Sequence, residues 1–400
     1  MLLPSDARRR ILERIRPASE VEEVPLAEAA GRVLAREAVS DVDLPPFEKS
    51  MMDGFAVRAS DFESGPRELV CLGTSRAGVF FPGPVPAGSC VEIFTGAELP
   101  RDCDAVEMVE RTRRDGDRVR FERAVRPGQN VSHRSEILAH GRAVFSPGRR
   151  LSAADLSVLA SIGLDPVTVF LRPRVSVLTT GDELVPAHEK PGPAQIREGN
   201  TLFLAAACER VGCRVRRQGI VPDEERALRA AFREALEHGD ALLTSGGVSV
   251  GRYDLVGEAF EAIGVEPLLH KVAIKPGKPI WFGMHGAKPV FGLPGNPVST
   301  LLGFEVFVRP ALARMAGAGA EEAERLRKGR WRGDRFRAAD RQENLPARIL
   351  HGADGIDECE PVPFRGSADI VAASLADALV VVPAESEIAA GELVEYRPLR

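Results

Sequence analysis

The chain has 400 residues, a net charge of −5 from 53 basic and 58 acidic residues, and an apolar content of 44%. Because a single hydrophobic core stops growing near roughly 250–300 residues, this length predicts two to four domains. No apolar run approaches the roughly 18 residues of a membrane span, and the charge balance gives no reason to expect a nucleic-acid or membrane partner.

The start of the chain carries three arginines, Arg8 to Arg10, before any apolar run. This is not the order of a secretory signal, so a cytoplasmic protein is expected. The six cysteines are scattered without C-x-x-C pairs. Buried free thiols are therefore expected in place of disulfides or a zinc site.

The first part of the chain has helical patterns on both sides of a β-like region. Residues 5–38 show helical spacing at Ile11 and Ile15, up to an interruption at Pro25. Residues 45–145 consist of short β-like runs between Gly and Pro, which predicts a β-rich domain. Ser152 is a typical N-cap for the helical pattern that follows it. We therefore group residues 1–44 with 146–172 as a helical linker domain.

Strand and helix patterns alternate from 173 to 320, which is typical of a parallel sheet covered by helices. The basic run at 325–337 is interpreted as a solvated linker, and 328–400 as a small β domain. The predicted fold class is multi-domain α/β plus β: an α/β domain with a parallel-rich sheet, a β-rich domain, a helical linker domain and a small carboxy-terminal domain resembling a β-barrel.

Four unusual loops follow strands of the α/β domain, at the edge where parallel sheets bind ligands. They are the stretches 179–183, 244–247, 275–279 with Lys271 before it, and 292–297. Glycine-rich turns before helices suit phosphates, and lysines act as mobile cations for oxyanions. Each loop alone could be an ordinary cap or surface turn. Four loops on one edge predict an anion site.

A G-x-S-x-G spacing at 247–251 suggests an alternative, a hydrolase with Ser249 as its nucleophile. That motif needs the serine at the junction of strand and helix, whereas the next helix is expected to begin near Asp254. No histidine stands in a recognisable triad setting. An anion cradle is therefore the better interpretation.

Outside the α/β domain, the stretch 44–57 ("LPPFEKSMMDGFAV") presents Asp53 on a turn. Pro45, Pro46 and Gly54 could simply shape that turn. An acidic residue on a rigid turn would also suit Mg²⁺ or oxyanion handling.

Six motifs, in this order, resemble the molybdopterin molybdotransferase family, the MoeA proteins and the E domain of gephyrin: "SMMDGFAV", "FTGAELP", "TTGDEL", "TSGGVSVGRYD", "VAIKPGKP" and "GLPGNPVS". The resemblance implies an elongated homodimer whose site lies between the α/β domain of one subunit and the β domain of its partner. It implies insertion of molybdate into adenylylated molybdopterin with release of AMP, and Mg²⁺ as the cofactor. Molybdopterin adenylyltransferase and cofactor-accepting enzymes would be further partners.

The resemblance and the four loops together assign site residues. The implied catalytic residues are Glu183, Asp254, Lys271, Lys275 and Asp53, with Glu183 and Asp254 as metal ligands. The implied substrate-binding residues are Thr95, Thr180, Gly181, Asp182, Asp223, Ser245, Gly246, Gly247, Ser249, Lys278, Pro294, Pro297 and Ser367.

The chain departs from the family pattern in two places. Ser132 and Ile137 replace an arginine and an aspartate, and the stretch "AQIREGN" at 194–200 lacks the usual tyrosine and aspartate. These departures motivate a first alternative function, a non-catalytic molybdopterin-binding or scaffolding paralogue. A second alternative is a molybdopterin adenylyltransferase, which the α/β domain alone also resembles.

Overall fold

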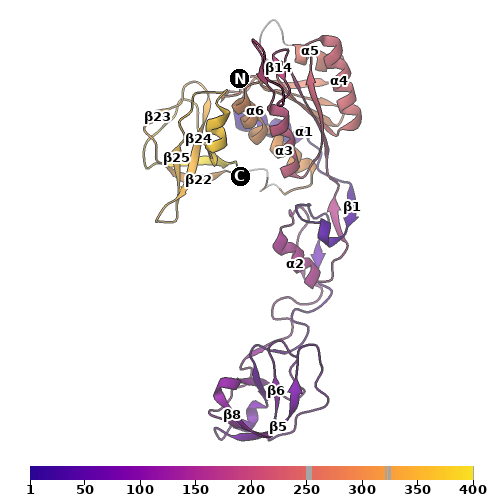
Figure 1. Cartoon of the computed structure of the whole chain (residues 1–400), viewed down its shortest axis with the longest axis vertical. Coiled ribbons are helices and arrows are strands. Elements are labelled where there is room, and N and C mark those ends of the chain that lie inside the picture. Colours follow the sequence, from indigo (N-terminus) through magenta and orange to yellow (C-terminus); the bar gives the residue numbers. More distant parts are fainter. Residues whose placement is uncertain (249–254, 320–321, 323–325, 400) are drawn as a thin grey trace.

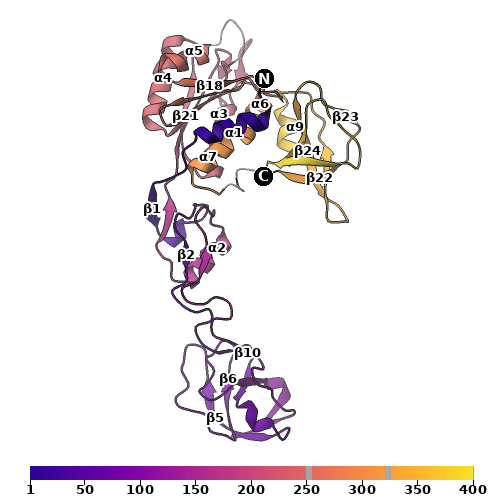
Figure 2. The ribbon, with the colours of Figure 1, turned by 180° about the vertical axis from the view of Figure 1, so that it is seen from behind.

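The computed structural model describes residues 1–248, 255–319, 322 and 326–399, and the molecule is elongated (Figure 1). The α/β domain and the carboxy-terminal domain lie together at one end, the linker domain follows, and the β domain lies at the other end, as the reverse view also shows (Figure 2). Among helices formed by the described residues, none has the length and apolar character needed to cross a bilayer.

The α/β domain contains a six-stranded sheet in the order β16-β13-β17-β21-β20-β18. Four strands run parallel, namely β13 (Arg174–Thr180), β16 (Arg214–Val221), β17 (Ala241–Ser245) and β21 (Lys288–Leu293). β20 (Trp281–His285) runs antiparallel to β21 on one side and to β18 (Glu266–His270) on the other. β16 coincides with the strand pattern "RVRRQGIV", so the predicted parallel-rich sheet is confirmed.

Helices cover both faces of this sheet. Val177 and Leu243 pack on one face against α3 (Asn200–Val211), α6 (Pro297–Gly303) and α7 (Arg309–Met315). Leu178 and Leu242 pack on the other face against α4 (Glu225–His238) and α5 (Leu255–Ala262). Successive strand residues thus enter opposite cores, which explains why these strands read as continuous apolar runs.

The amino-terminal helix α1 (Pro4–Arg14) belongs to the α/β core. Ala7 and Ile11 are fully buried there, beside α7 and the π-helical segment η4 (Phe304–Val308). The helical interpretation of 5–38 was wrong beyond residue 14. Residues 21–24 form strand β1 instead, because Pro17 and Pro25 cannot donate helix hydrogen bonds and β1 pairs with β12 (Val167–Phe170).

The linker domain consists of β1 with β12, β2 (Ala38–Val39) with β11 (Ala143–Phe145), η1 (Leu26–Glu28) and α2 (Ala153–Ser161). The predicted cap at Ser152 is confirmed. Its Oγ accepts a hydrogen bond from Asp155 N at 3.3 Å, and Asp155 Oδ2 accepts one from Ser152 N at 2.8 Å.

The β domain contains a six-stranded sheet in the order β7-β4-β6-β5-β9-β8. The strands are β4 (Gly54–Val57), β5 (Glu68–Ser75), β6 (Ser89–Ile93), β7 (Ala105–Met108), β8 (Thr112–Asp115) and β9 (Arg118–Phe121). 3₁₀ turns η2 (Ala59–Phe62) and η3 (Val109–Arg111) follow β4 and β7. A short pair, β3 (Lys49–Ser50) with β10 (Val131–Ser132), leads toward the linker domain.

The carboxy-terminal domain is a closed barrel. β24 (Gln342–His351), β25 (Asp357–Pro361), β22 (Arg327–Trp331), β28 (Leu393–Pro398) and β26 (Ala378–Val382) pair in turn, and β26 pairs back with β24. β23 (Phe336–Arg337) with β27 (Glu387–Ile388) and helix α9 (Ile370–Leu375) complete the domain. The predicted barrel-like domain, and with it the fold class, is confirmed.

The linker interpretation of the basic run was wrong, because its described part builds strands β22 and β23. Trp331 is buried in the barrel, while Arg330 and Arg332 form ion pairs with carboxylates of neighbouring strands and turns. Alternation of buried and charged residues is the mark of a strand with one solvated face.

Candidate active site

A cleft of about 630 Å³ opens at the carboxyl ends of β13, β17 and β21. Its lining includes eight of the residues assigned from sequence: Thr180, Gly181, Glu183, Asp223, Gly246, Gly247, Pro294 and Pro297. A short pair, β14 (Leu184–Val185) with β15 (Ile196–Arg197), adds Leu184 and Ile196 to the wall. All four predicted loops therefore reach the cleft at one edge of the sheet, the fourth through Pro279.

The turn after β17 requires glycine. Gly246 has a φ of +93°, and a Cβ atom there would overlap the carbonyl oxygen of Thr180. Gly247 follows with a φ of +66°. Successive left-handed residues bring the backbone close to the cleft without a side chain, which suits the approach of an anion.

The Ser245 side chain links the segments that line the cleft. Its side chain is fully buried, accepts a hydrogen bond from Asn200 Nδ2 at 2.8 Å and donates one to Pro294 O at 3.2 Å. Asn200 Nδ2 also donates to Gly295 O at 2.7 Å. Ser245 therefore shapes the cleft, whereas Asn200, at the start of α3, both lines the cleft and links two of its loops.

The carboxylates of the cleft are held by the first loop. Thr180 Oγ1 donates a hydrogen bond to Asp223, and Asp182 Oδ1 accepts one from Asp223 N at 3.2 Å. Asp182 thus fixes the backbone of Asp223, while Glu183 and Asp223 face the cleft. Two other assigned residues, Ser249 and Asp254, lie outside the described residues.

A second cavity of about 570 Å³ adjoins the cleft, because Pro279, Pro294 and Asn296 line both. It contains the assigned residues Lys275, Lys278 and Ser367. Ser367 Oγ accepts a hydrogen bond from Asn296 Nδ2 at 3.0 Å, which ties the last domain to the loop before α6. Lys271 has a left-handed backbone (φ 77°) and, in the part of the chain described, lines neither cavity.

Lys275 is held across a domain boundary. Its short strand β19 (Ile274–Lys275) joins β24 of the barrel, and its Nζ lies 3.0 Å from Glu343 Oε1. Asn344 Nδ2 donates a hydrogen bond to Lys275 O at 3.3 Å. Sequence reasoning missed Glu343, Asn344 and Arg341, which also line this cavity. The polar run "RQEN" at 341–344 was the available signal.

Asp53 and Thr95 lie in the β domain, at the far end of the molecule from the cleft (Figure 1). Asp53 Oδ1 accepts hydrogen bonds from Thr95 N and Thr95 Oγ1, both at 2.8 Å. Both hydrogen bonds hold the pKa of Asp53 below its usual range, and the bond from the backbone amide has the larger effect. One chain alone therefore does not bring these two residues to the cleft.

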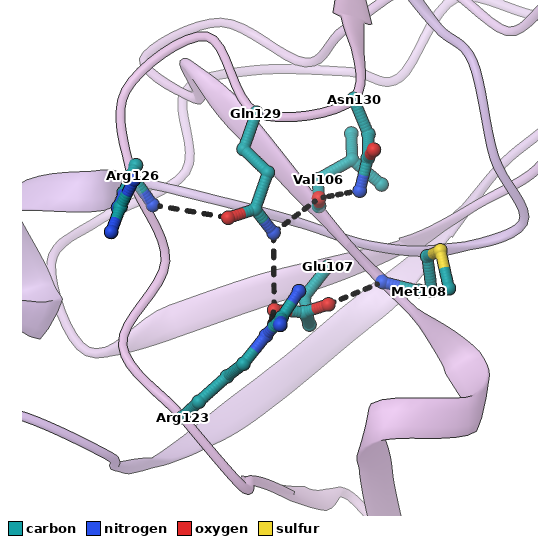
Figure 3. A network of polar contacts seen from close by, with 7 residues as sticks. All are labelled: Val106, Glu107, Met108, Arg123, Arg126, Gln129 and Asn130. Atoms are coloured by element: carbon teal, nitrogen blue, oxygen red, sulfur yellow. Dashed lines mark hydrogen bonds and ion pairs between the residues drawn. The ribbon is translucent and has the colours of Figure 1, made fainter.

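The turn that carries Asp53 is bonded to segments that hold a polar network around Glu107, and Figure 3 shows this network. The fully buried Glu107 accepts hydrogen bonds from Arg123 Nε at 3.2 Å and Gln129 Nε2 at 3.1 Å. Asn130 Nδ2 donates to Val106 O at 2.9 Å. Met51 N donates a hydrogen bond to Asn130 O at 2.9 Å. Val109 N donates one to Asp53 O at 3.1 Å.

Gly54 fits the same turn against β7. A Cβ atom at Gly54 would overlap the carbonyl oxygen of Glu107. Position 54 therefore has no room for a side chain, and the Asp53-Gly54 pair reflects close packing as well as turn shape.

One departure from the family pattern, Ser132 with Ile137, also lies in this region, whereas the other, at 194–200, contains β15 and lines the cleft. Ser132 Oγ donates a hydrogen bond to Glu136 Oε2 at 2.9 Å, which is the largest cause of a lowered pKa at Glu136. Arg134 Nε lies 2.6 Å from Asp43 Oδ2. Ile137 is 73% exposed. Arg134 and Glu136 are thus engaged locally, and position 137 presents an apolar side chain to its surroundings.

Thr95→Val is expected to raise the pKa of Asp53, because it removes the hydroxyl donor and keeps the backbone donor. A depressed carboxyl pKa stabilises the fold at neutral pH, and this stability is lost as the pH falls through the folded-state pKa. In Thr95→Val this contribution is smaller, and its loss is complete at a higher pH. Carboxyl NMR titration of Asp53 measures the shift, with Thr74→Val, which removes a hydroxyl bonded to Glu92, as the control. An unchanged Asp53 pKa would show that the Thr95 hydroxyl does not lower it.

Comparison with known proteins covers nearly the whole chain. Family models described as the MoeA N-terminal region (domain I and II), a probable molybdopterin binding domain and the MoeA C-terminal region (domain IV) match residues 3–163, 176–314 and 328–399. A molybdopterin molybdenumtransferase of Haemophilus influenzae is 37% identical over 318 residues, covering 79% of this chain and 78% of the relative. One of a Nostoc species is 32% identical, covering 93% and 87%.

A solved structure agrees with these sequence matches. The molybdopterin biosynthesis MoeA protein of Pyrococcus horikoshii OT3 superimposes with a TM-score of 0.85 at 30% identity, covering all of both chains. The three models, the relatives and this structure agree over the α/β domain, the linker and β domains and the barrel. The chain therefore belongs to the MoeA family of molybdopterin molybdenumtransferases.

Proposed function

We propose that this chain acts in molybdenum cofactor biosynthesis by inserting molybdate into adenylylated molybdopterin and releasing AMP. The observation that carries the proposal is the pair of adjoining cavities at the carboxyl ends of the parallel strands. One is lined by glycine backbone and carboxylates, the other by Lys275 and Lys278. Together they offer separate places for a phosphorylated organic ligand and for a small oxyanion.

Each part of this arrangement has a chemical task. The turn at Gly246 and Gly247 brings bare backbone close to the phosphates of the adenylate. Lys275 and Lys278 attract the molybdate dianion and the phosphate charge. Release of AMP requires water to attack one phosphorus atom and the bridging P–O bond to break. Cations near that bridge stabilise the charge that develops on the leaving group.

Mg²⁺ is proposed as the cofactor, and the donors in the cleft fit it. Mg²⁺ commonly takes one or two carboxylates, with substrate phosphates and waters as its other ligands. Within the described residues, three potential metal ligands do not gather at one point, but Glu183 and Asp223 both face the cleft. Glu183 would hold the ion with Asp254. When bound, Mg²⁺ would neutralise phosphate charge during bond cleavage.

We also propose that the functional unit is a homodimer. Asp53 and Thr95 are bonded to each other in the β domain, which lies at the opposite end of the molecule from the α/β domain (Figure 1). A second copy in the opposite orientation would bring its Asp53 turn to this cleft, and an isologous dimer would build two such sites. The exposed apolar side chains Met51 and Phe94 beside this turn suit burial in such a contact.

The proposal is tested by AMP release from adenylylated molybdopterin, measured with and without molybdate and with and without Mg²⁺. AMP release that needs both ions is the expected result. Tight adenylate binding with no release under any of these conditions would show a binding or scaffolding protein instead. Formation of the adenylate from molybdopterin and ATP would show an adenylyltransferase.

A further inference from the structure

A separate cavity of about 620 Å³ lies at the edge of the α/β sheet where β13 and β16 begin, away from the cleft. Its walls include residues 15–20 and 171–174, the two segments that join the α/β domain to the linker domain. Leu171 N donates a hydrogen bond to Glu20 O at 2.9 Å, so these two segments are paired. The cavity therefore lies at the joint between two domains.

Cations exceed carboxylates around this cavity. Its lining has five cationic side chains, Arg16, Arg172, Arg174, Arg214 and Lys288, against two carboxylates, Glu20 and Asp240. Asp240 is already occupied, because it accepts hydrogen bonds from Arg174 N, Nε and Nη2 at 2.9, 3.2 and 2.8 Å. Lys288 donates to the carbonyl oxygen of Leu236 and not to a carboxylate. The positive charge of the cavity is thus largely uncompensated.

Three guanidinium groups remain available for a ligand. For Arg16, Arg172 and Arg214, the described residues form no hydrogen bond or ion pair with the side chain, although the Glu22 carboxylate acts on Arg172 from a distance. Burial lowers the pKa of Arg172 the most, and the positive charges of Arg32 and Arg214 lower it further. Ile15 and Met315 add apolar wall beside these groups, and a low-dielectric wall strengthens the attraction of an anion.

We propose that this joint cavity binds a phosphate-bearing anion, which links Arg172 on the connecting segment to Arg214 on the sheet. Arginine forks match phosphate oxygens in paired hydrogen bonds. A volume of about 620 Å³ admits an anion as large as a nucleoside monophosphate. Because the bound anion would join the segment at 171–174 to the sheet, it fixes the angle at which the linker domain leaves the α/β domain.

The test is calorimetric titration of the full chain with inorganic phosphate and with AMP, at constant ionic strength. Arg172→Gln and Arg214→Gln are each expected to weaken binding about tenfold, since each loses a charged hydrogen bond. Arg226→Gln, which removes the same charge from the exposed side of α4, is the control and should bind like the natural chain. Thermal denaturation checks that each variant is folded.

Hydrogen exchange supplies a local readout, because the ligand should protect the amides of 15–20 and 171–174 in the natural chain and not in Arg172→Gln or Arg214→Gln. Equal affinity for both ligands identifies inorganic phosphate as sufficient, whereas tighter AMP binding identifies a nucleotide. Absence of saturable binding overturns the proposal. Binding that is unchanged in both Arg172→Gln and Arg214→Gln also overturns it, because the anion then binds outside this cavity. Neither result bears on AMP release, so this proposal and the proposed function fail separately.

Discussion

Lys275→Gln is expected to lower molybdate-dependent AMP release by about 100-fold or more, because it removes a cation that the proposed site directs at developing negative charge. The loss should appear mainly in kcat if Lys275 stabilises the transition state, and in the molybdate KM if it only binds the dianion. Steady-state kinetics at varied molybdate separate the two effects. Lys275 is half exposed but Glu343 is buried, so Lys275→Gln leaves a buried carboxylate without its cation, and thermal denaturation must show that the variant is folded.

Lys328→Gln is the matched control for this prediction. Lys328 is an exposed lysine on β22 of the barrel, so its substitution removes the same charge at a distance from both cavities. Activity close to that of the natural chain is expected. If Lys275→Gln and Lys328→Gln had equal activities, Lys275 would not belong to the reaction site.

Arg309→Leu is expected to lower the free energy of unfolding of the α/β domain by about 3–5 kcal/mol, because it leaves a buried carboxylate without its cation. Glu305 and Arg309 are both buried, and Arg309 Nε lies 2.8 Å from Glu305 Oε2. Burial raises the pKa of Glu305 above its usual range, against the opposing effect of Arg309. Removal of Arg309 therefore takes away the largest favourable effect on the Glu305 charge and leaves only the smaller effects of Arg397 and Arg210.

Urea denaturation can measure this effect in a Trp331→Phe background, because the chain has two tryptophans and the other, Trp281, is buried in the α/β core. The double variant Glu305→Leu/Arg309→Leu is the control. It removes both charges, so its stability should lie well above that of Arg309→Leu alone. Equal stabilities for the single and double variants would show that the pair is not coupled.

Local signals in the sequence were sufficient to predict most individual helices and strands. The N-cap at Ser152 and the strand at 214–221 follow from residue type and apolar spacing alone. All four glycine-, proline- and charge-rich loops reach the cleft, because the strands before them end on one edge of the sheet.

Contacts between distant segments could not be predicted from these local signals. The docking of α1 on the α/β core depends on a partner surface some 300 residues away, at α7 and η4. The pairing of β19 with β24, which places Glu343 beside Lys275, joins two domains through a strand of two residues. Such short pairings leave no periodic pattern, so only the assembled chain reveals them.

The central claim, that one site is built from two copies, is tested most directly by co-expressing Asp53→Asn with Lys275→Gln and measuring molybdate-dependent AMP release. Each variant alone should be nearly inactive. In random mixing half of the dimers are mixed, and each mixed dimer has one intact site, so recovery to roughly a quarter of the natural activity is expected. Co-expression of Glu183→Gln with Lys275→Gln should give no recovery, since both changes lie in the same half-site. If Asp53→Asn with Lys275→Gln also gave no more activity than either variant alone, the site would not be shared between two copies.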